Sequence, residues 1–416
     1  MCVNRKQIKA SAVLNKKRKD PDTMRKIATL NKISKAGLQN LPDDYTIVED
    51  INEASAVIVR SADLHSMEFP EKLLAIARAG AGVNNIPLDR CAEEGIVVFN
   101  TPGANANAVK ELVIGAMLMT SRNLLDAMRW ESSLSSNKDV TDVLKAVEKG
   151  KGQFAGTEIK GKTLGVIGLG AIGVLVANAA QQLGMNVMGY DPYITLNSAH
   201  ALSNTIPVIK DLSILLNKSD YVSIHVPVND STKGMIDSRR IDQMKDGCVF
   251  LNFARNTLVS EDALYEALQE GHIRRYVTDF ATERFLGMDS VISIPHLGAS
   301  TSEAEDNCAV MAGDQLVDFL ENGNIVNSVN FPSISMGKLN PEAACRIVIL
   351  NRNLPSMIAQ VTTAFSMFNI NIRDMTNKSK GAYACTMMDL DEVVTEEQCK
   401  LLEQIDGIIS ARVITA

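Results

Sequence analysis

The sequence has no CxxC pair, no long apolar run and no excess of basic residues. Its seven cysteines are scattered and odd in number, which argues against a disulfide framework or a zinc site and favours reduced thiols in the cytoplasm. The apolar stretch 112–119 is too short to span a bilayer. The net charge of −7 argues against a nucleic-acid surface. We therefore expect a cytoplasmic protein without a membrane or nucleic-acid partner, and nothing in the sequence requires a metal.

The chain is long enough for two or three domains. It has 416 residues, of which 46% are hydrophobic and 22% charged, the balance of a globular protein. Residues 1–19 carry seven Lys or Arg and no acid. We expect residues 1–24 to be a disordered basic extension, with an organelle signal as the alternative.

Apolar runs of strand length alternate with helical stretches through two blocks. The first block has runs at 26–30, 45–50, 55–60, 73–80 and 95–100, and a long helix is expected at 105–128. The second has runs at 163–168, 186–191, 221–227, 248–254, 276–280 and 291–296. This alternation predicts parallel sheets. The class is α/β: a doubly wound, Rossmann-like nucleotide domain (105–296) inserted in a flavodoxin-like substrate domain (25–104 and 297–330).

A third, smaller domain is expected at the C-terminus. Ser302 and Glu305 have the spacing of a capping box that begins a helix ending near Gly323. A linker rich in Asn, Ser and Pro follows, and we place it at residues 331–342. Residues 343–416 then give a βαββαβ pattern, a small α+β domain.

A glycine-rich turn predicts a dinucleotide site. Gly168, Gly170 and Gly173 follow a strand and open a helix, so backbone amides and the positive end of the helix face a pyrophosphate. Asp191 ends the next strand, 18 residues past Gly173. Its carboxylate suits ribose hydroxyls and repels a 2′-phosphate, which favours NAD over NADP.

Polar residues at the carboxyl ends of the later strands predict the chemistry. His296 is the expected base, because neutral imidazole accepts a hydroxyl proton near pH 7. Glu283 is its expected carboxylate partner, and Arg255 the expected anchor for a substrate carboxylate. Each alone is also typical of an ordinary loop residue. Together, with His225 and Pro227 at the same edge, they predict hydride transfer to or from a 2-hydroxy acid.

The sequence resembles the D-isomer-specific 2-hydroxyacid dehydrogenase family. The matching segments are VRSAD, RAGAGVNNI, FNTPGANANAVKELV, GVIGLGAIG, FLNFARN, DFATE and IPHLGAST. Within that family, the resemblance implies oxidation of 3-phosphoglycerate to 3-phosphohydroxypyruvate with NAD, the first step toward L-serine. It also implies that the C-terminal piece is an ACT-like regulatory domain.

The resemblance assigns further residues by position. It implies cofactor contacts at Gly168, Gly170, Ala171, Ile172, Gly173, Asp191, His225, Pro227, Phe253, Ala254, Arg255, Asp279, His296, Leu297, Gly298 and Ala299. It implies substrate contacts at Arg60, Ser61, Gly80, Ala81, Gly82, Asn105, Lys110 and Arg255. Asn353 and Asn371 match residues that bind a serine effector, although Asn351 and Ser356 depart from that pattern.

Two departures bear on the site. Thr278 stands where the family has an Asp beside the nicotinamide, and Asp279 is the candidate substitute. A second phosphate-binding cation is missing at Ala62, and Lys110 is the candidate replacement.

Alternative functions share this fold. One is a sister enzyme acting on glyoxylate, hydroxypyruvate or D-lactate, against which Arg60 and the ACT-like tail argue. The other is an NAD-sensing corepressor or scaffold. A homodimer or homotetramer is expected, since the helix at 105–128 suits an interface, although it suits a core equally well.

Overall fold

The computed structural model describes residues 25–136 and 142–415, so the predicted basic extension at 1–24 lies outside the described residues. The chain divides into two compact units. Unit 1 holds the described residues up to Thr101 and from Cys308 onward, and unit 2 runs from Pro102 to Asn307. The domain boundaries drawn from the sequence stay a prediction.

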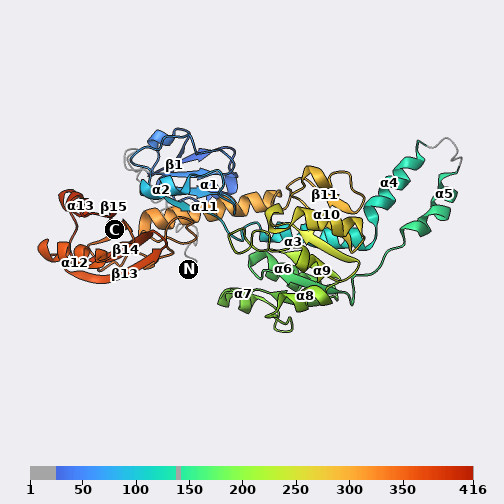
Figure 1. The fold of residues 1–416 in the computed structure, drawn as a ribbon. Coiled ribbons are helices and arrows are strands. Elements are labelled where there is room, and N and C mark those ends of the chain that lie inside the picture. Colours follow the sequence, from blue (N-terminus) through green and yellow to red (C-terminus); the bar gives the residue numbers. More distant parts are fainter. Residues whose placement is uncertain (1–24, 137–141, 416) are drawn as a thin grey trace, which may run out of the picture. The chain divides into compact units, whose positions relative to one another are not determined.

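The first sheet of unit 1 is parallel and five-stranded (Figure 1). Its strands are β1 (Arg25–Leu30), β2 (Tyr45–Val48), β3 (Ala56–Val59), β4 (Ala75–Arg78) and β5 (Val97–Phe99), in the order β2-β1-β3-β4-β5. Helices α1 (Lys35–Gln39) and α2 (Leu88–Glu93) and the 3-10 turn η2 (Ile51–Glu53) belong to this part. All four residues of β3 are buried, as expected for a central parallel strand. This strand order confirms the flavodoxin-like prediction.

Unit 2 holds a six-stranded parallel sheet in the order β11-β10-β9-β8-β6-β7 (Figure 1). Its strands are β6 (Thr163–Ile167), β7 (Asn186–Tyr190), β8 (Tyr221–Ile224), β9 (Cys248–Asn252), β10 (Ile273–Thr278) and β11 (Val291–Ser293). A parallel bridge from Gly189 to Val208 extends the β7 edge. Two hydrophobic clusters draw on alternate residues of the same strands, so the sheet is covered on both faces. The doubly wound prediction is confirmed.

The helices of unit 2 are α3 (Ala106–Ser121), α4 (Leu124–Leu134), α5 (Val143–Gly150), α6 (Ala171–Gln182), α7 (Leu196–Ala201), α8 (Leu212–Lys218), α9 (Ser238–Asp242) and α10 (Glu261–Gln269). Of these, α3, α4 and α5 precede β6 in the chain, and the other helices of this unit lie between its strands. The 3-10 turns are η3 (Lys151–Phe154), η4 (Asn256–Leu258) and η5 (Glu283–Phe285).

Two helix details differ from the prediction. The single helix expected at 105–128 is broken, because Asn123 has φ +49° in the left-handed region, where α3 has ended and α4 begins. The helix α11 (Ser302–Asn322) is present, but the side chain that caps it is Thr301, whose hydroxyl accepts the Ala304 N–H at 3.1 Å. The predicted capping box at Ser302 and Glu305 is therefore wrong: the cap lies one residue earlier, and the residue three positions after it is Ala304, which cannot complete a box.

The C-terminal part of unit 1 is the predicted βαββαβ domain. An antiparallel sheet, β13-β14-β12-β15, is built from β12 (Cys345–Arg352), β13 (Ile372–Lys380), β14 (Tyr383–Leu390) and β15 (Ile408–Ile414). Helices α12 (Met357–Met367) and α13 (Glu396–Glu403) connect the strands, and α13 begins with a complete capping box at Thr395.

Two arginines, of which Arg346 is buried and Arg412 half-buried, attach this sheet to the end of α11. Arg346 of β12 is fully buried and pairs with Asp389 of β14 at 2.6 and 2.9 Å, and its guanidinium also donates to the carbonyls of Asn322 and Gly337. Arg412 of β15 donates to the carbonyls of Phe319 and Leu320. The last carbonyls of a helix have no partner inside it, and side chains of the ACT-like sheet fill this need. Among the described residues, no helix has the length and apolar character to cross a membrane.

Candidate active site

The glycine turn after β6 has the geometry of a phosphate cradle. Gly168 has φ +90°, and a Cβ there would lie 2.7 Å from the His225 carbonyl oxygen. A Cβ on Gly173 would collide with the Gly168 carbonyl, so the strand and α6 can pack closely only with glycine. Around Gly170 the space is open, and no side chain caps α6. The free first-turn amides of α6 are therefore available to an anion.

Asp191 follows β7 and is held by backbone amides. Its Oδ2 accepts the Leu169 N–H at 2.9 Å, and its Oδ1 accepts the Tyr193 N–H at 2.9 Å. Each carboxylate oxygen has a second lone pair free for a hydroxyl donor. The predicted ribose-binding carboxylate is thus oriented beside the glycine turn.

His225 follows β8 with its imidazole enclosed. Nε2 lies 2.8 Å from the Ser223 hydroxyl, while Nδ1 is buried and has no partner among the described residues. Burial lowers the pKa of His225 to about 4, so the ring is neutral at physiological pH. The Nδ1 atom of this neutral ring is therefore able to make one further hydrogen bond to a group that reaches it.

A buried polar network shapes the turn that carries Arg255. The side chain of Asn252, the last residue of β9, donates to the Arg255 carbonyl at 2.9 Å and accepts the Ala254 N–H at 3.1 Å. The same amide lies 3.2 Å from the Tyr276 hydroxyl on the neighbouring strand β10. The turn is therefore fixed by side chains rather than by a glycine after Arg255, where the sequence has Asn256.

Phe280 contacts two of the three predicted catalytic residues. Its ring centroid lies 4.4 Å from that of His296, and the Arg255 guanidinium carbon lies 5.0 Å from the same ring. Arg255 is half-buried and His296 exposed. The base and the anion-binding residue thus meet on one aromatic ring, although they lie 41 positions apart in the sequence.

Glu283 is not joined to His296 in the same way. It is exposed and begins η5, and among the described residues no hydrogen bond or ion pair connects its carboxylate to the imidazole. Its role as the partner of His296 stays a prediction.

Asp279 is the carboxylate that the sequence did not predict to be buried. It is 3% exposed, its Oδ2 accepts the Gly298 N–H at 3.0 Å, and its Oδ1 is buried without a partner among the described residues. The neighbouring Thr278 hydroxyl accepts the Phe280 N–H at 3.0 Å. Thr278 is thus occupied within its own turn, and Asp279 retains a free oxygen.

Some predicted substrate residues lie in unit 1, in a well-braced loop after β4. The Ala81 carbonyl accepts the Asn100 side-chain amide at 2.7 Å, and the Gly80 carbonyl accepts the Thr101 N–H at 3.1 Å. Gly80 has φ +149°, and the Arg78 guanidinium packs where a Cβ would stand. Arg78 thus lies beside the amides predicted to bind the substrate carboxylate. The sequence analysis did not identify it as a site residue, because it stands at the end of an apolar strand.

The remaining predicted substrate residues differ in setting. Asn105 precedes α3 in unit 2, and Lys110 is half-buried on α3 with its amine 3.5 Å from Glu111. In unit 1, Asn31 accepts the Ser61 N–H at 3.0 Å, which fixes the segment after Arg60.

The two predicted effector asparagines lie at opposite ends of the ACT-like hairpin. The Asn353 N–H donates to the Ala382 carbonyl at 2.8 Å, and the Asn371 amide donates to Asp391 at 2.6 Å. The eight residues of β14 separate these partners, a span of about 27 Å. One chain therefore does not bring both asparagines to a single small ligand.

Comparisons with known proteins identify the family of this chain. The D-isomer specific 2-hydroxyacid dehydrogenase, NAD binding domain, matches residues 114–298. A D-3-phosphoglycerate dehydrogenase of Escherichia coli K12 is 33% identical, over 89% of this chain and 90% of that protein. The chain belongs to the D-isomer-specific 2-hydroxyacid dehydrogenase family.

Two further relatives give the same family. A D-3-phosphoglycerate dehydrogenase of Methanocaldococcus jannaschii is 37% identical over 76% of this chain, which spans 59% of that protein's length. A crystal structure of NAD+-bound 3-phosphoglycerate dehydrogenase from Entamoeba histolytica matches with a TM-score of 0.56 and 27% identity, over 74% of this chain and 99% of that one.

The residues of unit 2 fit a dinucleotide. The open space at Gly170, the uncapped start of α6 and the unpaired nitrogen of His225 are features that a bound pyrophosphate and its nucleosides would satisfy. The predicted NAD site and the family's NAD-binding domain therefore coincide.

Proposed function

We propose that this chain catalyses the NAD-dependent oxidation of 3-phospho-D-glycerate to 3-phosphohydroxypyruvate, the first step of L-serine biosynthesis. The observation that carries the proposal is the meeting of His296 and Arg255 on the Phe280 ring, in a chain whose full-length relatives are D-3-phosphoglycerate dehydrogenases.

In this proposal, each side chain has one task. Arg255 binds the substrate carboxylate, because its planar guanidinium matches two carboxylate oxygens. His296 accepts the C2 hydroxyl proton. Glu283 matches the family's carboxylate in the catalytic set, and its task would be to orient the imidazole and stabilise its protonated form. NAD, when bound, supplies the acceptor for the hydride that leaves C2.

The binding residues follow from the same reading. Asp191 would bind the adenosine ribose and disfavour NADP. Arg60, Ser61 and Asn105 would face the phosphate end, with Lys110 replacing the cation absent at Ala62. Gly80, Ala81 and Gly82 would offer backbone amides to the carboxylate.

Assembly and regulation complete the proposal. We infer a homodimer or homotetramer, with L-serine as effector of the ACT-like domain. Because Asn353 and Asn371 are about 27 Å apart along one hairpin, a serine site that uses both needs a second copy of the chain.

The test is an assay of NADH absorbance with 3-phosphoglycerate and NAD. We expect turnover by the parent and by the control variant His200→Ala, an exposed residue of α7. His296→Ala should lose roughly a thousandfold in kcat while keeping its NAD affinity, since general-base catalysis contributes about 10²–10⁴. Full activity in His296→Ala, or turnover of glyoxylate or D-lactate in place of 3-phosphoglycerate, would refute the proposal.

A further inference from the structure

A second carboxylate is hydrogen-bonded to the loop that carries the predicted catalytic base. Asp279 directly follows β10, and Phe280, on which His296 and Arg255 both rest, is the next residue. The Asp279 side chain points inward, since it is 3% exposed, whereas Glu283 is exposed. Two acidic residues thus stand near the end of the same strand in opposite environments.

One oxygen of Asp279 holds the loop that carries His296. Oδ2 accepts the Gly298 N–H at 3.0 Å, two residues after the imidazole. A Cβ on Gly298 would lie 3.0 Å from that oxygen, which is tighter than ordinary contact, and 3.5 Å from Val109 of α3, which is an ordinary contact distance. The absence of a side chain at Gly298 therefore lets the carboxylate reach the amide.

The other oxygen is unpaired. Oδ1 is buried and has no hydrogen-bond partner among the described residues. Buried acceptors are nearly always paired, and exceptions occur where a functional group is needed. The charged neighbours that face Asp279 are His296, from the loop after β11, and Arg255, from the loop after β9; α3 presents Val109.

These groups act on the carboxylate in opposite directions. Burial raises the pKa of Asp279, while the Gly298 N–H and the charges of His296 and Arg255 lower it. A negative charge here is costly unless a positive charge forms beside it, and protonation of His296 would supply one.

We propose that Asp279 is a positioning residue for His296: its carboxylate fixes the His296–Gly298 turn and stabilises the imidazolium that forms when His296 accepts the substrate's proton. This inference rests on the proposed function, because it assumes that His296 is the base. Asp279 would thus be a second carboxylate that serves His296, besides Glu283. The family has an acid at the position of Thr278, whereas this chain has its acid one residue later, at Asp279.

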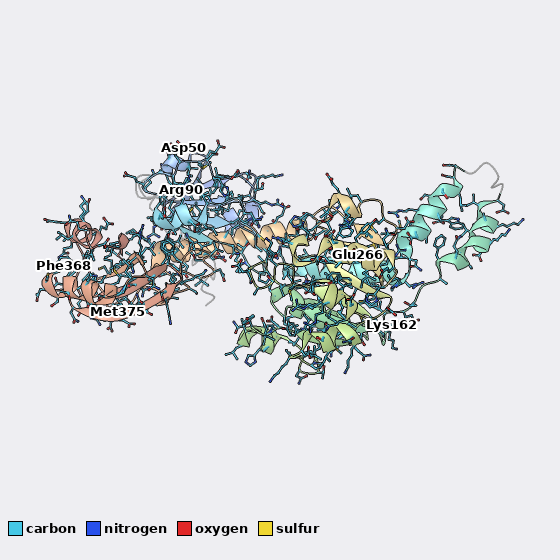
Figure 2. The ribbon with its side chains drawn as sticks, in the orientation of Figure 1. Asp50, Arg90, Lys162, Glu266, Phe368 and Met375 are labelled. Carbon is cyan, nitrogen blue, oxygen red and sulfur yellow. The ribbon has the colours of Figure 1, made fainter. Side chains whose placement is uncertain are left out.

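The first test needs no turnover. In the ligand-free full chain, the imidazole of His296 is titrated by NMR in the parent, Asp279→Asn, Glu283→Gln and the control Glu266→Gln, an exposed residue of α10 labelled in Figure 2. Loss of a nearby negative charge should move the titration midpoint of His296 in Asp279→Asn to lower pH than in the parent. The Glu266→Gln midpoint should not move.

The second test uses the pH profile of kcat/KM. In Asp279→Asn the acid limb should shift to lower pH and the plateau should fall roughly tenfold. A structural role alone would lower the plateau without moving the limb. An unmoved His296 midpoint in Asp279→Asn overturns the proposal, as does a shift confined to Glu283→Gln.

A further variant keeps the proposal testable if Asp279→Asn does not fold. Gly298→Ala keeps the carboxylate but crowds it against the amide, and should lower kcat while leaving the His296 midpoint within about 0.3 of the parent. Unchanged kcat in Gly298→Ala counts against the proposal. Activity in His296→Ala would instead defeat the proposed function, so the two failures are distinguishable.

Discussion

Substitution of Arg346 by Met should loosen the ACT-like sheet of unit 1. The guanidinium is fully buried and makes two bonds to Asp389 and one each to the carbonyls of Asn322 and Gly337. Methionine fits the space of the side chain but leaves a buried carboxylate uncompensated and the Asn322 carbonyl without this donor, whereas the Gly337 carbonyl keeps the Asn324 amide at 3.0 Å.

The expected loss follows from these contacts. Removal of one partner of a buried ion pair costs about 3–5 kcal/mol. With a urea m value of roughly 3 kcal/mol/M, a loss of about 4 kcal/mol lowers the unfolding midpoint by about 1.3 M. The double variant Arg346→Met/Asp389→Leu should recover roughly half of that, because the stranded charge is gone while the Asn322 carbonyl still lacks the arginine donor.

The assay is urea unfolding followed by circular dichroism, with hydrogen exchange of the β12 amides as a second probe. Arg352→Met, an exposed residue at the end of the same strand, is the matched control. A midpoint for Arg346→Met within about 0.3 M of the control would refute this account of the pair.

Three further outcomes are expected. Burial lowers the pKa of His225 to about 4, against about 6.5 in the unfolded chain, so the folded state resists protonation. The free energy of unfolding should therefore fall by up to about 3 kcal/mol as the pH drops from about 6.5 to about 4. In urea titrations, His225→Gln should flatten this dependence on pH. Lys110→Ala should raise KM for 3-phosphoglycerate roughly tenfold at unchanged KM for NAD, the worth of about one charge-assisted hydrogen bond; an unchanged KM contradicts its assignment to the phosphate. Gly173→Ala should abolish NADH fluorescence enhancement or lower Tm by several degrees, since its Cβ collides with the Gly168 carbonyl; parent-like binding and Tm would speak against close packing there.

Much of the fold could be predicted because local patterns and tertiary structure agree. Buried parallel strands such as AVIV of β3 are continuous apolar runs, and glycine turns mark the strand ends. The break at Asn123 was missed because helical residues continue on both sides of it, and only the backbone angle of one asparagine divides them. The cap of α11 was placed one residue late because Thr301 and Ser302 are both good caps.

The candidate site was predicted in its residue types more than in its contacts. Strand ends placed Arg255 and His296 at one edge, and the structure joins them through Phe280, a residue with no polar group to attract notice. The burial of Asp279 could not be predicted, because a carboxylate after a strand is normally solvated. Which of the two carboxylates, Asp279 or Glu283, faces the imidazole depends on the path of the backbone between them. The periodicity of the sequence does not specify that path.

The pairing of β5 with the segment after α11 affects how the chain folds. The Val98 N–H donates to the Asn330 side chain, and the Asn330 amide donates to the Ile96 carbonyl, across 232 and 234 positions. On the ribosome, the amino-terminal strands of unit 1 emerge long before this partner, while every strand of the unit 2 sheet is made in between. During synthesis, the β5 edge of the first sheet therefore lacks its Asn330 contacts until the inserted unit has been made.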